Sequence, residues 1–232
     1  MARRTHHPVH WYQGAWAVLL KDLRLELRSR YALNTLFVFV LGALLLVALA
    51  VSREDIGARA QAGLLWIVIL FAAALGLGRS FIQEQERGTA LFLRLHTTSS
   101  MVYAGKLVYN SLLGMAVNFV SLGAFIVLSG VEVAHWSLLL TTILLGTLGL
   151  SGTTTILAAI IARTSRRGAL LPVLLFPLLV PLLMSTVDAT RKSFAGGAGG
   201  WAASVDSLMA LIAFTGVVIT ASVLLFDHVW HD

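Results

Sequence analysis

The 232-residue sequence contains no cysteine, only four prolines and few charged residues. Without cysteine, the chain cannot form disulfides, thiolate metal sites or thiol-based active sites. Asp, Glu, Lys and Arg make up 12% of the residues, about half of the roughly 25% that is usual in soluble domains. A water-soluble protein of this length needs a larger polar surface, so the composition is typical of a chain embedded in a lipid bilayer.

Other missing features disfavour further classes of function. The net charge of +6 comes from short segments between long uncharged runs, without the basic stripe and interleaved aromatics of a nucleic-acid surface. Gly105 and Lys106 lack the earlier glycine and the hydroxyl residue of a phosphate-binding loop, so we do not expect the chain to hydrolyse ATP. No histidine pairs with a carboxylate at metal-binding spacing, so no metal site is predicted. A lone haem ligand at His135 is left as an alternative.

Six runs without Asp, Glu, Lys or Arg are each long enough to cross a hydrocarbon core about 30 Å thick. Continuous apolar runs favour helices, because barrel strands would alternate. We therefore predict one all-α membrane domain, residues 1–232, with spans at approximately 33–51, 61–80, 107–129, 137–161, 168–187 and 207–226. Thirteen Lys and Arg on one side against four on the other predict that both termini and the loop 82–106 are cytoplasmic.

Residues 11–31 precede the first span and have the pattern of an amphipathic helix. Steps of three and four place apolar side chains on one face, namely Tyr12, Trp16, Leu19, Leu20, Leu23, Leu27 and Tyr31. Asp22, Arg24 and Arg28 fall mostly on the opposite face. The pattern predicts an interfacial helix with its aromatics at headgroup depth. Two interpretations stay open: the charges contact lipid phosphate or a partner, or the helix is an anchor without a contact role.

The loop 82–106 is the largest predicted cytoplasmic element. Glu84, Glu86 and Arg87 precede Gly88, which permits a backbone turn that is costly for other residues. A short apolar helix that includes Leu91 follows, just outside the membrane. Such a helix suits a permease that receives force from a soluble motor protein. The alternative is a solvated elbow that only joins two spans.

Uncharged polar residues recur inside the third and fourth spans. Asn110, Gly114, Asn118 and Ser121 share one helical face of the third span. Small and amide side chains let helices approach closely and form hydrogen bonds across the contact, so we favour packing over a substrate path. No charged residue lies deep in a span, which argues against an ion-coupled secondary transporter.

The fifth span contains Pro172, Pro177 and Pro181. Each proline removes an amide donor and presses on the preceding turn, so this helix should bend or break. We predict that it faces either a second copy of the chain or the transported molecule, with a kinked lipid-facing helix as the alternative. The external stretch 188–206 is glycine-rich and is expected to be a flexible connection or a partly re-entrant hairpin.

Four segments resemble the haem exporter B (CcmB) family, a branch of the ABC-2 type permeases used in cytochrome c maturation. They are KDLRLELRSRYAL at 21–33, FIQEQERGTALFL continuing to AGKL at 81–107, LGTLGLSGTTTILAAIIARTSRRGALLP at 145–172, and LLPVLLFPLLVPLL at 170–183. The loop motif is specific for ABC-2 permeases in general, whereas the charged start combined with the triple-proline helix is more specific. The family often has an acidic residue shortly after the loop glycine, where this chain has Leu91 and Phe92.

The resemblance implies a dimer of six-helix subunits in the inner membrane of a bacterium or archaeon. It also implies a separate ATPase subunit, CcmA, and the further partners CcmC and CcmD. Haem would be a transported or handled ligand and not a resident cofactor. The CcmA contact would fall on Glu84, Glu86, Arg87, Gly88 and Leu91, flanked by Asp22, Arg24 and Arg28.

The function predicted from the sequence is therefore a non-enzymatic permease subunit that couples ATP hydrolysis by CcmA to haem export or release. One alternative is an ABC-2 permease that exports a lipid, a drug or a polysaccharide. Another is a scaffold or an intramembrane enzyme, although an enzyme would need catalytic groups within a span.

Overall fold

The computed structural model of the chain describes residues 10–51, 56–77, 79, 81, 84, 88, 93, 97–162, 167–195 and 200–231. Within these ranges the chain is helical, with turns and short connections and no strand. The helices are α1 (Trp11–Ser29), α2 (Tyr31–Val51), α3 (Ala58–Gly76), α6 (Ser99–Ser129), α7 (Trp136–Ile161), α8 (Arg167–Phe194) and α9 (Gly200–His231).

Six of these helices, α2, α3, α6, α7, α8 and α9, are long and apolar enough to cross a membrane. The prediction of an all-α membrane protein with six spans is confirmed. The side chains on the outside of the bundle are mostly large and apolar, and Val38 and Leu46 are 73% and 69% exposed. This is the surface expected of a bundle whose solvent is lipid, because burying an apolar side chain away from hydrocarbon gives no hydrophobic stabilisation.

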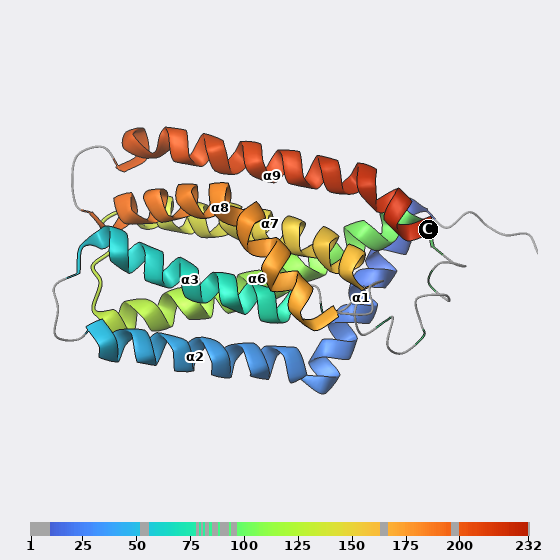
Figure 1. Cartoon of the computed structure of the whole chain (residues 1–232), viewed down its shortest axis with the longest axis horizontal. Helices are drawn as coiled ribbons and strands as arrows, with labels where there is room; N and C mark the ends of the chain where they lie inside the picture. The colour runs from blue at the N-terminus through green and yellow to red at the C-terminus, as the bar shows by residue number, and fades with distance from the viewer. Residues whose placement is uncertain are drawn as a thin grey trace, which may run out of the picture.

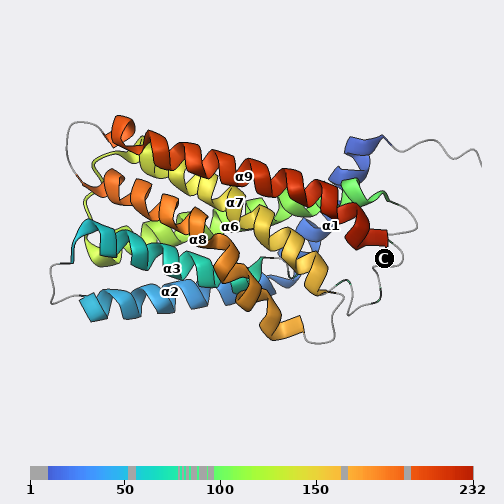
Figure 2. The same ribbon diagram turned by 45° about the horizontal axis from the view of Figure 1, so that its top comes forward.

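The six long helices lie side by side, and α1 crosses one end of the bundle at a steep angle to them (Figures 1 and 2). The end of α3, the start of α6 and the carboxyl end of α9 lie at this same end. The end of α2 and the start of α3, the end of α6 and the start of α7, and the end of α8 and the start of α9 lie at the opposite end. We call the first the α1 end and the second the distal end.

α1 and α2 are joined by one residue, Arg30, in the left-handed conformation with φ 51°. Its N–H donates to the carbonyl of Glu26 at 2.6 Å, which ends α1. The Glu26 side chain then accepts the N–H of Leu33 at 2.9 Å, in the first turn of α2. A carboxylate at this place satisfies an unpaired amide and interacts favourably with the helix dipole, so the turn between the two helices is firmly set.

α7 lies in the middle of the bundle, and uncharged polar residues join it to its neighbours. Asn110 donates to Thr155 at 2.9 Å and Asn118 donates to Thr147 at 2.8 Å, both from α6 to α7. Every one of these four side chains is at least 96% buried. The contacts support the packing interpretation of the polar stripe, because both amides form hydrogen bonds between helices.

Three helices extend beyond the predicted spans by seven residues or more. α6 begins at Ser99, inside the predicted loop 82–106, and the predicted connection 188–206 is helical up to Phe194 and again from Gly200. Charged residues end the part of a helix that tolerates lipid, but they do not end the helix. In the last turns of α8, Asp188 pairs with Arg191 at 2.9 Å and with Lys192 at 2.5 Å, and such i,i+3 and i,i+4 pairs favour the helix in water.

α8 carries the three prolines and remains one helix, but its ribbon bends between the proline-bearing half and the distal half (Figures 1 and 2). Pro177 and Pro181 are exposed on the outer surface beside Val173 and Met184, which are 64% and 70% exposed. The side chain of Pro172 lies outside the described residues. The described prolines therefore face away from the interior of this chain, towards lipid or another protein.

Candidate functional site

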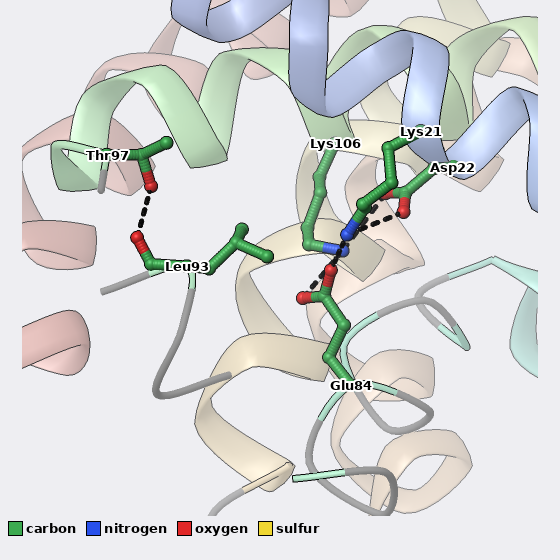
Figure 3. A network of polar contacts seen from close by, with 6 residues as sticks. All are labelled: Lys21, Asp22, Glu84, Leu93, Thr97 and Lys106. Atoms are coloured by element: carbon green, nitrogen blue, oxygen red, sulfur yellow. Dashed lines mark hydrogen bonds and ion pairs between the residues drawn. The ribbon is translucent and has the colours of Figure 1, made fainter. Parts of the chain in front are cut away.

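Four charged side chains meet at the α1 end of the bundle (Figure 3). Lys21 and Asp22 come from α1, Glu84 from the loop between α3 and α6, and Lys106 from α6. The Lys106 ammonium lies 3.0 Å from Asp22 Oδ2 and 3.0 Å from Glu84 Oε2. The Lys21 ammonium lies 3.1 Å from Asp22 Oδ1 and also pairs with Glu84 Oε1. Each lysine thus bridges both carboxylates, and the four groups form a closed ring of alternating charge.

This charge ring is largely removed from solvent. The side chain of Lys106 is 0% exposed, that of Asp22 is 4% and that of Glu84 is 9%, whereas that of Lys21 is 34% exposed. A charge buried this far is tolerated only when it is paired, and here two ammonium groups balance two carboxylates. Burial lowers the pKa of the Lys21 ammonium, but the carboxylates of Asp22 and Glu84 outweigh it, so that pKa lies above its usual 10.5.

Two glycines bring α1 close enough to α6 for the ring to form. A Cβ atom added to Gly105 would lie 2.6 Å from the carbonyl oxygen of Ala15 and 2.8 Å from Cβ of Val18. A Cβ added to Gly14 would lie 2.5 Å from the sulfur of Met101. Because Gly105 precedes Lys106, the closest approach of the two helices directly positions the lysine facing Asp22.

An aromatic cluster holds the other side of the loop. Phe81 packs on Phe226 of α9 with ring centroids 5.8 Å apart, and Phe226 in turn contacts Tyr103 at 5.3 Å and Trp230 at 5.6 Å. The Lys106 ammonium lies 4.6 Å from the centre of the Phe81 ring, within the range of a cation–π contact. The start of the loop is therefore held by ions on one side and by rings on the other.

The predicted contact residues of the loop do not share one environment in the structure. Glu84 is part of the buried charge ring, so its carboxylate faces α1 and α6 of its own chain. Gly88 is exposed and has a φ of 69°, the left-handed conformation for which a glycine was predicted there. Glu86, Arg87 and Leu91 lie outside the described residues. Leu93 is buried, and its carbonyl accepts both the N–H and the hydroxyl of Thr97 (Figure 3).

α1 has three faces where the sequence indicated two. Tyr12, Trp16 and Leu27 are exposed, as expected of a lipid-facing side, and Arg24 and Arg28 are exposed on another. Asp22, which was expected to lie with the arginines, is 95% buried against α6. The i,i+4 series on this inner face is Gly14, Val18, Asp22 and Glu26. The sequence did contain a signal for this third face, because the acidic residues Asp22 and Glu26 lie four residues apart and continue the same spacing from Gly14 and Val18.

Lys106 and Phe81 had no predicted role, although both contribute to the site. The signal in the sequence was weak, since Lys106 sits at the edge of an apolar run, where a lysine usually extends to the headgroups. Its burial depends on two carboxylates, those of Asp22 and Glu84, which lie far from it in the sequence. Within the described residues, no group of three His, Asp or Glu is placed to hold a metal ion. His135 lies in the distal connection, with its N–H donating to the carbonyl of Ser193 at 3.0 Å.

The bundle interior offers little room near the polar stripe. A cavity of about 10 Å³ lies between α2, α3, α6 and α7, and is lined in part by Leu36, Ala73, Gly114 and Asn118. That volume accepts at most about one water molecule. A ligand of the size of a porphyrin does not fit in this cavity.

Comparison with known proteins identifies the family. The family model described as CcmB protein matches residues 13–227. Heme exporter protein B of Paracoccus denitrificans is 29% identical over 211 residues, which cover 88% of this chain and 90% of that protein. Heme exporter protein B of Rhodobacter capsulatus is 31% identical over 198 residues, or 83% of this chain and 88% of that protein. The protein of the same name from Pseudomonas aeruginosa is 30% identical over 198 residues, or 82% and 88%.

Proposed function

The chain belongs to the CcmB family, and we propose that it is the membrane-spanning subunit of a haem exporter that serves cytochrome c maturation. The observation that carries this proposal is the extent of the match, which includes all seven described helices except the first residues of α1 and the last residues of α9. The relatives that match over most of their length are named heme exporter protein B. The six apolar helices agree with a multi-pass membrane subunit.

We further propose that a separate ATPase subunit, CcmA, supplies the energy at the α1 end. The chain lacks a phosphate-binding loop, so its energy must come from a partner that binds two conformations with different affinity. α1, the end of α3, the start of α6 and the end of α9 all lie at one end of the bundle, where a soluble partner can reach them together. The positive-inside pattern favours placing this end in the cytoplasm.

The residues proposed to touch CcmA change once the burial of Glu84 is taken into account. A carboxylate paired with two lysines of its own chain has little left for a partner. Gly88 and the arginines Arg24 and Arg28 are exposed and remain contact candidates, together with Glu86, Arg87 and Leu91 of the same loop. The partners CcmC and CcmD and a second copy of the chain complete the proposed complex, and the outer surface of α8 near Pro177 and Pro181 is the surface we assign to the second copy.

The first test is genetic. Deleting the gene in its native host should abolish covalent haem staining of c-type cytochromes, and the wild-type gene should restore it. Normal staining in the deletion strain, combined with altered membrane lipid or surface polysaccharide, would instead support an ABC-2 permease for another cargo.

The second test addresses the ATPase contact with two matched charge reversals. Arg87→Glu alters a proposed contact residue, whereas Arg59→Glu alters an arginine at the distal end whose side chain is 74% exposed. Tagged chain co-expressed with CcmA should lose the ATPase on pull-down in the first variant and keep it in the second. Equal recovery of CcmA with both variants would place the contact elsewhere.

A further inference from the structure

We propose that Glu84 is a positioning residue that ties the loop to α1 and α6, so that the three segments move as one body. This inference rests on the proposed function, because it concerns how a movement that enters at the loop reaches the bundle. It assigns Glu84 a role inside the chain, in place of a contact with the ATPase subunit.

The geometry of the charge ring carries the argument. Both oxygens of Glu84 are engaged, one by Lys21 of α1 and the other by Lys106 of α6, and both oxygens of Asp22 are engaged by the same two lysines. Among the described residues, Glu84 joins the ring from the segment between α3 and α6, and the other three members belong to α1 and α6 (Figure 3).

Burial makes the ring costly to open. If the loop moved away alone, two ammonium groups would face one carboxylate, and the Lys106 ammonium is fully buried and cannot turn to water. An unbalanced buried charge is strongly unfavourable, so displacement of the loop should carry α1 with it. The close contact at Gly105 holds α1 against α6 beside this lysine, and the Phe81 ring lies 4.6 Å from its ammonium.

Pairs of substitutions can cut the tether while keeping the charge balance. Glu84→Gln with Lys106→Met removes one anion and one cation and separates the loop from both α1 and α6, leaving Lys21 and Asp22 as a neutral pair on α1. Asp22→Asn with Lys106→Met removes the same charges but leaves the pair between Lys21 and Glu84, which still joins the loop to α1. The second double variant is therefore the matched control for the first.

The experiment uses the complex with its ATPase subunit in lipid nanodiscs and measures three quantities. They are the ATPase subunit recovered per chain, the melting temperature, and ATP hydrolysis by the complex relative to the ATPase subunit alone. We expect full recovery with both variants and a melting temperature that is similar in the two. The relative hydrolysis should fall by roughly fivefold or more in the tether-cut variant and by less than about twofold in the control.

A cross-link distinguishes a mechanical tether from a change in local charge. Because the chain has no cysteine, Lys21→Cys with Glu84→Cys introduces its only two thiols and removes one charge of each sign. This variant should behave as tether-cut when reduced. A reversible bifunctional thiol reagent, added to the purified chain before assembly, should restore hydrolysis, and a reductant should abolish it again. This variant also serves if the first one fails to fold.

Three outcomes would overturn the inference. Wild-type hydrolysis in the tether-cut variant would show that the link is not needed. Equal loss of hydrolysis and of melting temperature in both double variants would assign the ring a purely structural role. Loss of the ATPase subunit from the tether-cut variant alone would make Glu84 a docking residue after all. Failure of the proposed function is distinguishable, because it would appear as no ATPase subunit recovered with the wild-type chain.

Discussion

The close approach of α1 to α6 at Gly105 leads to a quantitative prediction for Gly105→Ala. The added methyl group would meet a backbone oxygen of α1 at 2.6 Å, and a backbone atom cannot move aside as a side chain does, so α1 itself must shift. Overpacking of this kind costs about 1–3 kcal/mol. Alanine regains about 1 kcal/mol through its higher helix propensity. The net effect should be a loss of up to about 2 kcal/mol of unfolding free energy.

The same substitution at Gly123 is the matched control. Gly123 lies in the same helix, is exposed, and has no atom within 4 Å of an added Cβ, so Gly123→Ala should be neutral or stabilising by up to about 1 kcal/mol. At roughly 2–4 °C per kcal/mol for a chain of this size, the two variants should differ in melting temperature by several degrees.

The assay is thermal unfolding of the purified chain in detergent, followed by tryptophan fluorescence. Trp11 and Trp16 report on α1 directly, because both lie on its exposed side. If Gly105→Ala melted at or above the temperature of Gly123→Ala, α1 would not be packed on α6 as described, and the basis of the charge ring would be lost.

Three further predictions concern the interior and the ring. Asn118→Ala should lower the unfolding free energy by about 1 kcal/mol, because an interhelical hydrogen bond to Thr147 is lost. The same change in a Thr147→Val background should cost measurably less, and equal costs would mean that the two side chains do not interact. Trp66→Phe removes the donor of the buried 2.9 Å hydrogen bond to Thr190 and should lower the free energy of chemical unfolding by about 1–3 kcal/mol. An unchanged denaturant concentration at the unfolding midpoint would contradict that hydrogen bond. The pKa of Lys21 is raised in the folded chain, so the stabilisation from its charge should be complete below pH 10.5 and be lost as the pH rises through the raised value. The melting temperatures of wild type and Lys21→Met should therefore converge only at strongly alkaline pH, and convergence near neutral pH would refute this prediction.

The membrane architecture could be predicted because it depends on local composition. A helix in lipid has to satisfy its own backbone hydrogen bonds, so a sufficiently long run without charge specifies a span whatever its neighbours are. The helix ends were less predictable. α6 begins at Ser99, inside the predicted loop, and α8 continues past Asp188, where ion pairs with Arg191 and Lys192 support the helix in water.

The candidate site was predictable only in part. Gly88 was expected to allow a turn, and the structure places it in the left-handed conformation. The loop was identified as a candidate for contact with a partner, but the direction of Glu84 was not foreseen. A carboxylate in a charged loop usually faces water, and its burial depends on Lys21 and Lys106, which no local pattern links to it.

From the amino-acid sequence alone follow the lipid environment, the six apolar helices, the amphipathic start and the family resemblance. The tertiary structure decided which charges of α1 face inward, that Asn110 and Asn118 bind threonines of α7, and that four charges from three segments close into a ring. The physical reason is the separation along the chain of the groups that interact. Burial in lipid acts on each residue through its nearest neighbours in the chain, whereas ion pairs form between groups that only the packing of helices brings within about 3 Å of each other.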